Sequence, residues 1–383
     1  MDNVNRRKVL KGMAAIPLTL SGLPSFAQSR LSLHLGSGQP TSFAWVGLIS
    51  TVFKEEIIRR SAGKYDIRFQ ESYGGQLYKN NATLSSVAEG IVDIGWVFSP
   101  LEGSRLPLNT VYGSTPFCTE SLPIMLNVMN QLHAQHPAMR AEWEKNNVVF
   151  LGANGLDNYN LYTKTPINSM ADLRGKRLGA PGVLGNWIRN TGATAVDGNL
   201  STYYTDAQTG VIDGCVSIAT GILPAKIYEV LPYITMVNLG AGYLGALAIN
   251  KDRYQRLPAD LQQILHDSGQ EYSRQLGLEV MRRYTSAFGE MVKAGAQQNP
   301  KVQISNFPDA ERQKWIQGLP NLSAEWVKTN EARGLPARQI MTSYMDLMRK
   351  MERTPRDQMY YLTDQELVSS NLEGTDVSYD EWI

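Results

Sequence analysis

The sequence is poor in the residues that most often carry metal and redox chemistry. It has 383 residues but only two cysteines and four histidines. It contains no H-E-x-x-H, G-x-S-x-G or P-loop pattern, so the signatures of zinc proteases, serine hydrolases and P-loop nucleotidases are missing. The cysteines, Cys118 and Cys215, could form a disulfide in an exported chain or remain as two buried thiols, and their spacing does not decide.

Two of the histidines stand at a spacing that can bind a metal ion. His133 and His136 are three residues apart on an expected helix. The segment around them has no carboxylate or cysteine, and Pro137 should disturb the helix. We therefore expect a solvated helix face here, with no metal site, and the sequence indicates no cofactor.

Charge of one sign and long apolar runs are also lacking. The net charge is +1 and charged residues make up 19%, which offers no basic surface for nucleic acid. No stretch after the N-terminal segment is apolar for long enough to cross a membrane as a helix. Hydrophobic residues make up 43%, so we expect a soluble chain with a large core and length for two domains.

The N-terminal segment has the order of an export signal. NRRKVLK at residues 5–11 is close to the twin-arginine pattern, and an apolar run follows at 13–23. Ser25 and Ala27 are small residues placed for cleavage after Ala27. The alternative is a basic helix of the mature fold. The order of the regions favours a signal peptide over 1–27 and export to the periplasm by the twin-arginine route.

The most informative stretch covers residues 171–214, ADLRGKRLGAPGVLGNWIRNTGATAVDGNLSTYYTDAQTGVIDG. A strand at 176–180 should end at Pro181, with a helix start over 186–190. A second helix over 201–209, capped by Ser201, leads to a strand entry. This alternation predicts a parallel α/β sheet, in which ligands bind beyond the carboxyl ends of the strands, beside exposed helix N–H groups.

The rest of the chain also alternates between strand and helix patterns. The other expected strands are 31–36, 65–72, 90–97, 148–152, one from 161, 233–239 and 302–307. The other expected helices are 43–61, 81–89, 120–146, 221–230 and several from about 308 to 351. Apolar residues at steps of three and four after residue 257 predict a helix of about ten turns, long enough to cross the molecule.

A G-x-G-x-x-G pattern occurs at residues 240–245, GAGYLG, after an expected strand. A dinucleotide site needs a helix next, but ALAIN at 246–250 predicts another strand. We therefore interpret the match as accidental.

Several blocks together resemble a known family. LRGKRLGAPG, GATAV and DAQTGVIDG, in this order and spacing, are similar to the signature of the DctP family, the periplasmic solute-binding proteins of tripartite ATP-independent (TRAP) transporters. GGQLY, GIVD, Pro116-Phe117 and LPADLQ resemble further family blocks, so the resemblance covers nearly all of 31–350. It implies a two-domain α/β fold with mixed sheets flanked by helices, a hinge between the lobes and a long domain-spanning helix.

The resemblance also implies a domain division and a function. The implied parts are the signal peptide 1–27, domain I at 31–155 plus about 241–275, domain II at 156–240 plus about 276–350, and a C-terminal extension at 351–383. The implied function is capture of a small organic solute, an organic acid in the first place, between two lobes for delivery to TRAP membrane permease subunits. No catalysis is required. An exported enzyme and a sensor or adaptor that reuses the fold are the alternatives, and a homodimer through the C-terminal helices or tail stays open.

Most family members hold a carboxylate with an arginine on the strand before the proline turn. That position is Gly179 here, and a second frequent arginine falls on or beside Tyr159. Two hypotheses follow: an acid held by Arg189 and helix N–H groups, or a neutral or cationic solute lined by aromatic side chains. The competing roles are core packing for Trp187, a surface salt bridge for Arg189, and core packing again for Trp45 and Phe98, where it is the favoured role. The ligand-binding residues implied by family position are Trp45, Trp96, Phe98, Ser99, Tyr159, Gly179, Asn186, Trp187 and Ser217. Arg189, about two turns beyond Pro181, is added as the candidate replacement for the missing guanidinium.

Overall fold

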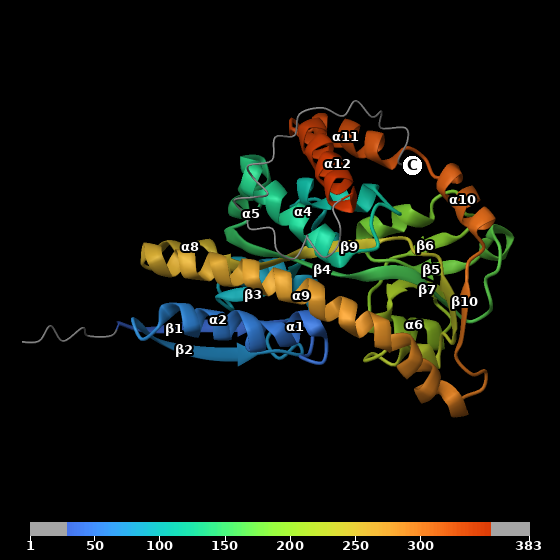
Figure 1. The fold of residues 1–383 in the computed structure, drawn as a ribbon, viewed down its shortest axis with the longest axis horizontal. Coiled ribbons are helices and arrows are strands. Elements are labelled where there is room, and N and C mark those ends of the chain that lie inside the picture. The colour runs from blue at the N-terminus through green and yellow to red at the C-terminus, as the bar shows by residue number, and fades with distance from the viewer. Residues whose placement is uncertain (1–28, 354–383) are drawn as a thin grey trace, which may run out of the picture.

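The computed structural model describes residues 29–353 and joins ten strands in one mixed sheet (Figure 1). The main order is β2-β1-β3-β9-β4-β7-β5-β6, and β8 pairs with β4 and with β10. The strands are β1 (Ser29–Gly36), β2 (Tyr65–Ser72), β3 (Ile94–Phe98), β4 (Val148–Thr163), β5 (Arg177–Gly179), β6 (Thr194–Val196), β7 (Gly214–Ile218), β8 (Tyr233–Met236), β9 (Ala241–Asn250) and β10 (Gln303–Asn306).

Helices surround this sheet, and their pattern confirms the α/β class. The α-helices are α1 (Ala44–Leu48), α2 (Lys54–Ser61), α3 (Thr83–Ala88), α4 (Leu122–Gln135), α5 (Pro137–Lys145), α6 (Tyr203–Gln208), α7 (Ala219–Ile222), α8 (Lys251–Gln255), α9 (Ala259–Ala294), α10 (Asp309–Gly318), α11 (Leu322–Glu331) and α12 (Ala337–Arg353). A π-helical segment, η1 (Ile49–Phe53), joins α1 to α2, so the helix expected over 43–61 is one helical stretch. Among the described helices, none is long and apolar enough to cross a membrane.

Short 3-10 helices fill several of the connections between these elements. They are η2 (Asn80–Ala82), η3 (Ser99–Glu102), η4 (Leu108–Ser114), η5 (Met170–Leu173), η6 (Gly182–Ile188), η7 (Ile227–Glu229) and η8 (Gly295–Gln297). The helix expected over 221–230 is interrupted, because only α7 and η7 form within it.

Two long strands connect the halves of the sheet. β4 pairs with β9 along its first part and with β7 and β8 along its second part. We expected two strands, at 148–152 and from 161, but the structure has a single strand of 16 residues. Three register shifts against β9 interrupt its alternating pattern, and such bulges explain why the sequence pattern breaks inside one strand.

The G-x-G-x-x-G pattern begins one residue before β9 and continues into that strand, and it begins no helix, as expected. Gly245 pairs with Phe98 of β3 and has a φ of 117°. A Cβ atom at this position would meet the carbonyl oxygen of Val97 at 1.9 Å. The glycine therefore serves the close approach of two strands rather than a phosphate.

The predicted parallel unit forms around β5. β5 pairs in parallel with β6 and β7, and η6 and α6 make the two connections. Two details of the prediction are wrong. The helix expected to start over 186–190 is the 3-10 helix η6, which ends at Ile188, and α6 follows Thr202 with no side-chain cap from Ser201.

The longest helix is α9, with 36 residues, as the apolar spacing predicted. Figure 1 shows it running along the length of the molecule, past β1–β3 at one end and the β5–β7 region at the other. The expected helix over 120–146 is split into α4 and α5, because Pro137 interrupts it. The last helix, α12, packs on α4.

Candidate functional site

A cavity of about 340 Å³ lies where segments from both halves of the sheet meet. Residues after β1 and at the end of β3 form one wall, and residues after β5 and in β7 form the other. The described residues that line it are Gln39, Trp45, Trp96, Phe98, Leu156, Tyr159, Pro181, Asn199, Leu200, Tyr203, Val216, Ser217, Ile218 and Leu244. The predicted site residues among them are Trp45, Trp96, Phe98, Tyr159 and Ser217.

The first wall is aromatic and rigid. The ring centroids of Trp45 and Trp96 are 6.0 Å apart, and those of Trp96 and Phe98 are 5.4 Å apart. Phe43 stacks behind Trp45 at 4.7 Å. All four rings are buried, so their orientations are fixed by packing before any solute enters.

Gln39 adds a polar group whose orientation is fixed by its neighbour. The indole Nε1 of Trp45 donates a hydrogen bond of 2.7 Å to Oε1 of Gln39. An indole N–H can only donate, so the amide oxygen must face it and the NH2 group is left as the donor end. The Gln39 side chain is 4% exposed, which makes it a buried amide in the cavity wall.

Tyr203 occupies the space where the resemblance implied an arginine. A Cβ atom at Gly179 would meet Cε1 of Tyr203 at 2.5 Å. The tyrosine hydroxyl donates to the carbonyl of Gly198 at 2.9 Å, which holds the ring in place. No side chain fits at Gly179 unless this ring moves, and an arginine is the least suited of all.

Arg189 lies on the surface and does not line the cavity. It caps the end of η6, and its Nη1 is 2.5 Å from Oε2 of Glu325 in α11. The two side chains are 41% and 50% exposed. This arrangement is the surface salt bridge that we weighed against a ligand clamp.

The other predicted residues lie outside the cavity lining. Trp187 is buried, donates to the carbonyl of Gly113 at 2.9 Å, and packs edge-on against Tyr159 at 5.4 Å. Asn186 lies in η6, and the buried Ser99 begins η3. Trp187 thus supports a cavity residue from behind, which is the core-packing role.

The described lining residues include no aspartate, glutamate, lysine, arginine or histidine. Burial raises the pKa values of Tyr159 and Tyr203 well above the usual range, so both phenols stay neutral at physiological pH. The nearest acid along the chain is Asp157, whose carboxyl accepts hydrogen bonds from the N–H and hydroxyl of Thr220 at 3.1 and 3.2 Å. The cavity wall is therefore uncharged.

Nine lining residues were not predicted from the sequence. They are Gln39, Leu156, Pro181, Asn199, Leu200, Tyr203, Val216, Ile218 and Leu244. Some had a usable signal, since Gln39 follows the carboxyl end of a parallel strand and Pro181 ends another. Tyr203 had none, because its place depends on side-chain packing against Gly179.

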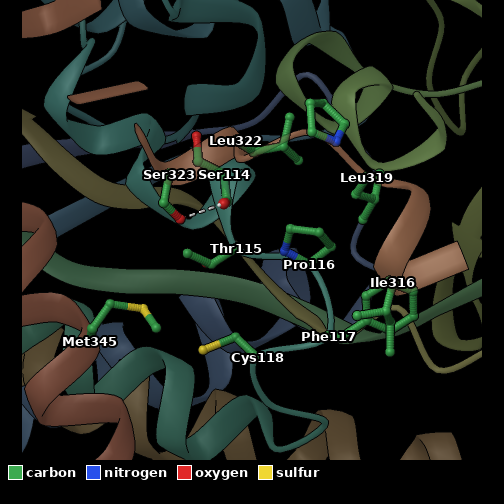
Figure 2. A pocket seen from close by; sticks show the side chains of 11 residues that line it. Ser114, Thr115, Pro116, Phe117, Cys118, Ile316, Leu319, Leu322, Ser323 and Met345 are labelled. Carbon is green, nitrogen blue, oxygen red and sulfur yellow. Dashed lines mark hydrogen bonds between the residues drawn. The ribbon is translucent and has the colours of Figure 1, made fainter. Parts of the chain in front are cut away.

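A second cavity, of about 470 Å³, lies between residues 114–118 and α10–α12 (Figure 2). Ser323 donates to the carbonyl of Ser114 at 3.0 Å across one side of it. Burial raises the pKa of the Cys118 thiol to about 12, so this cavity offers no reactive thiolate. None of the predicted site residues lines it.

Both cysteines are buried and free, which excludes the disulfide alternative. Cys118 belongs to the larger hydrophobic core, which includes β1, β3 and α4, and Cys215 to a smaller cluster under β7. Within residues 29–353 no group of three or more potential ligands could hold a metal ion.

The expectation of a solvated histidine pair is wrong for His133. This side chain is buried and stacks on Phe150 at 3.7 Å between ring centroids. Its Nδ1 is 2.7 Å from the carbonyl oxygen of Met129, to which it donates, and the indole of Trp143 donates to Nε2 at 3.0 Å. Burial lowers the pKa of His133 to about 3, so it is a neutral core residue.

Residues 38–330, more than half of the chain, match the family model described as bacterial extracellular solute-binding protein, family 7 (DctP). A solute-binding protein of Sulfitobacter sp. is 29% identical over 253 residues, which are 64% of this chain and 73% of that protein. A solute-binding protein of Albidiferax ferrireducens is 21% identical over 330 residues, 82% of this chain and 91% of that protein.

Solved structures share the fold. A Bordetella pertussis extracytoplasmic solute receptor binding pyroglutamic acid has a TM-score of 0.70 at 19% identity, over 82% of this chain and 99% of that chain. A marine metagenome TRAP protein specific for aromatic acids, in complex with metahydroxyphenylacetate, has a TM-score of 0.73 at 21% identity. The match covers 84% of this chain and 100% of that chain. A Rhodoferax ferrireducens TRAP protein with copurified benzoate has a TM-score of 0.71 at 20% identity. The match covers 84% of this chain and 98% of that chain.

Proposed function

This chain belongs to the bacterial extracellular solute-binding protein family 7, and we propose that it captures a small organic solute in the aromatic cavity for delivery to a TRAP membrane permease. Family members are the solute-binding components of transporters, so the chain is a binding protein and not an exported enzyme. The single observation that supports the site is the cavity itself. Gln39 and Trp45 enclose it from one half of the sheet, and Pro181 and Ser217 from the other.

The class of solute has support from the structural neighbours. They bind small organic acids, among them pyroglutamic acid, metahydroxyphenylacetate and benzoate. An organic acid is therefore the first class to test, and a neutral or cationic solute is the second candidate because the cavity wall carries no cation.

A thermal-shift screen of organic acids, polyols and amines on the mature protein tests this function. A solute at about 100 times its dissociation constant should stabilise the folded state by about 2.7 kcal/mol. Uptake of that solute by cells should then require both this protein and the two membrane subunits. Uptake that persists without the permease would contradict the transport role.

The proposed lobes are 31–155 plus about 241–275, and 156–240 plus about 276–350. They fit the pairing of β4, whose first part lies with β9 and whose second part lies with β7 and β8. Closure of the lobes around the solute would be a hinge motion on these connecting strands.

Export is proposed to follow the twin-arginine route, and the family description supports an extracytoplasmic location. The signal lies outside the described residues, so it rests on the sequence alone. Replacing Arg6 and Arg7 with lysine should hold the precursor in the cytoplasm. Normal appearance of the mature form in the periplasm after this change would contradict the route.

A homodimer through the C-terminal helices or the 351–383 extension remains a proposal. Within the chain, α12 packs on α4 and α11. Light scattering on the mature protein and on a variant that stops after Arg353 would measure the mass of each. A monomeric mass for both proteins would contradict the homodimer.

A further inference from the structure

We infer that this cavity recognises a small, flat, ring-containing solute through uncharged groups, so that a neutral ring compound binds at least as tightly as the matching carboxylic acid. The inference rests on the proposed function, because it names the solute chemistry of the same site. Three properties of the cavity support it: its charge, its walls and its hydrogen-bond donors.

The cavity has no cation where a carboxylate would need one. Its described lining residues are all uncharged, and the position before the proline turn is Gly179, covered by the ring of Tyr203. Arg189 is paired with Glu325 on the surface. A buried carboxylate without a cation or a full set of donors loses more hydration than it regains. The site therefore gives a negative charge no advantage.

The walls favour a planar solute. Trp45, Trp96 and Phe98 present consecutive tilted rings on one side, and Tyr159 and Tyr203 lie among the residues on the other. These aromatic faces suit the flat face of a ring.

The available hydrogen-bond donors indicate the polar end of the solute. Gln39 uses its oxygen for Trp45 and so offers its NH2 group. The indole N–H of Trp96 is buried and has no hydrogen-bond partner within the described part of the chain. Buried N–H groups without partners are uncommon and Trp96 lines the cavity, so this N–H is assigned to an acceptor oxygen of the solute. An amide or other carbonyl on the ring supplies such an oxygen without a charge.

Matched pairs of probes test this chemistry. We would measure dissociation constants by calorimetry at pH 7.5 for benzamide against benzoate, and for phenylacetamide against phenylacetate, with benzylamine as the cation. We expect each amide to bind at least as tightly as its acid and at least tenfold more tightly than the amine. An acid more than threefold tighter than its amide, a tighter amine, or no binding by either amide overturns the inference.

Two variants locate the recognition. Trp96→Phe keeps a ring in the wall but removes the N–H, and should weaken amide binding about tenfold, the value of one hydrogen bond of about 1.4 kcal/mol. Arg189→Ala is the control and should leave both members of a pair unchanged. If Trp96→Phe binds the amide as tightly as the wild type, the indole N–H does not bind the solute. If Arg189→Ala loses acid binding, the claim that the site is uncharged is wrong.

The outcomes separate this inference from the proposed function. An acid that binds far more tightly than its amide overturns the inference, yet permease-dependent uptake of that acid would leave the transport role in place. Tight amide binding without permease-dependent uptake would contradict the transport role and leave the uncharged site standing.

Discussion

At the scale of single residues, two buried carboxyl groups link the stability of this protein to pH. Burial raises the pKa values of Asp157 and Glu142 to about 7, although both accept hydrogen bonds. The partners of Glu142 are the N–H groups of Leu108 and Asn109. Carboxyls in an unfolded chain titrate near pH 4. The folded state therefore holds protons that the unfolded state releases, and stability falls as pH rises from about 4 to 7.

Replacing Asp157 with asparagine tests this linkage. The amide keeps an oxygen for Thr220 but cannot ionise, so the variant should lose less stability between pH 5 and pH 8 than the wild type. One such carboxyl changes the free energy of unfolding by at most about 1.4 kcal/mol per pH unit. Chemical denaturation at several pH values measures it, and parallel curves for both proteins would contradict a protonated Asp157.

Asp213→Asn provides the control of opposite sign. The hydrogen bond from Arg177 lowers the pKa of Asp213, so its contribution is present above pH 4 and is lost as pH falls through the lowered pKa. The side chains of Arg177 and Asp213 are 48% and 29% exposed, so the pair should contribute less than about 1 kcal/mol to the free energy of unfolding.

The family pattern placed some residues beside the cavity, whereas residues whose place depends on packing could not be predicted. Trp45, Trp96 and Ser217 were expected at the site, and they line the cavity. Tyr203 was missed because its ring lies over Gly179, a contact that no local pattern reveals. His133 was placed on a solvated face because the spacing of α4 does not show that Phe150 and Trp143 cover it.

At the scale of elements, the crossing of α9 over β4 depends on two facing glycines. A Cβ atom at Gly152 of β4 would meet the carbonyl oxygen of Gly269 at 2.1 Å. A Cβ atom at Gly269 of α9 would meet the carbonyl oxygen of Leu151 at 2.5 Å. Both contacts are with backbone atoms, so neither can be relieved by a side-chain rotation. The glycines let the long helix approach the connecting strand closely.

Gly269→Ala should therefore destabilise the protein by roughly 1–3 kcal/mol or more, the usual cost of overpacking. Gly289→Ala is the matched control in the same helix, because a Cβ atom there meets nothing within 4 Å. It should stabilise the protein by about 0.5–1 kcal/mol, since glycine is unfavourable in a helix interior. Urea denaturation of both variants measures the difference, and equal effects would contradict the close crossing.

Elements with a strong period were predictable, and irregular ones were not. The apolar spacing of α9 and the alternation in β1 and β2 predicted the first and last residues of these elements to within about two residues. β4 was split in the prediction, because three register shifts against β9 interrupt its alternation. η6 was misplaced because a 3-10 turn of Gly182–Ile188 has no apolar period of its own.

At the scale of the whole molecule, the two proposed lobes touch beside the cavity. η6 lies against η3 and η4, which follow β3. A Cβ atom at Gly182 would meet the carbonyl oxygen of Pro100 at 2.1 Å, and one at Gly113 would meet Cγ2 of Val183 at 2.7 Å. These contacts join segments on either side of the cavity. If the lobes open and close, η6 must move relative to η3 and η4.

Gly182→Ala should hinder closure of the lobes. The added methyl group would push η6 from η3, so small-angle scattering should show a radius of gyration that decreases less with solute than in the wild type. Gly182 also has a φ of +49°, which strains any L residue, so a control with the same strain is needed. Gly210→Ala supplies it, because Gly210 has a φ of +78° and a Cβ atom there meets nothing within 4 Å.

Both variants should lose roughly 1 kcal/mol of stability from the positive φ. Only Gly182→Ala should also weaken binding of the tightest solute of the screen, because a solute that needs the closed form must supply the energy of the displaced contact. The scattering curve of Gly210→Ala with solute should match that of the wild type. A wild-type radius that is the same with and without saturating solute would contradict hinge closure, and equal solute binding by both variants would place the moving contact elsewhere than at η6 and η3.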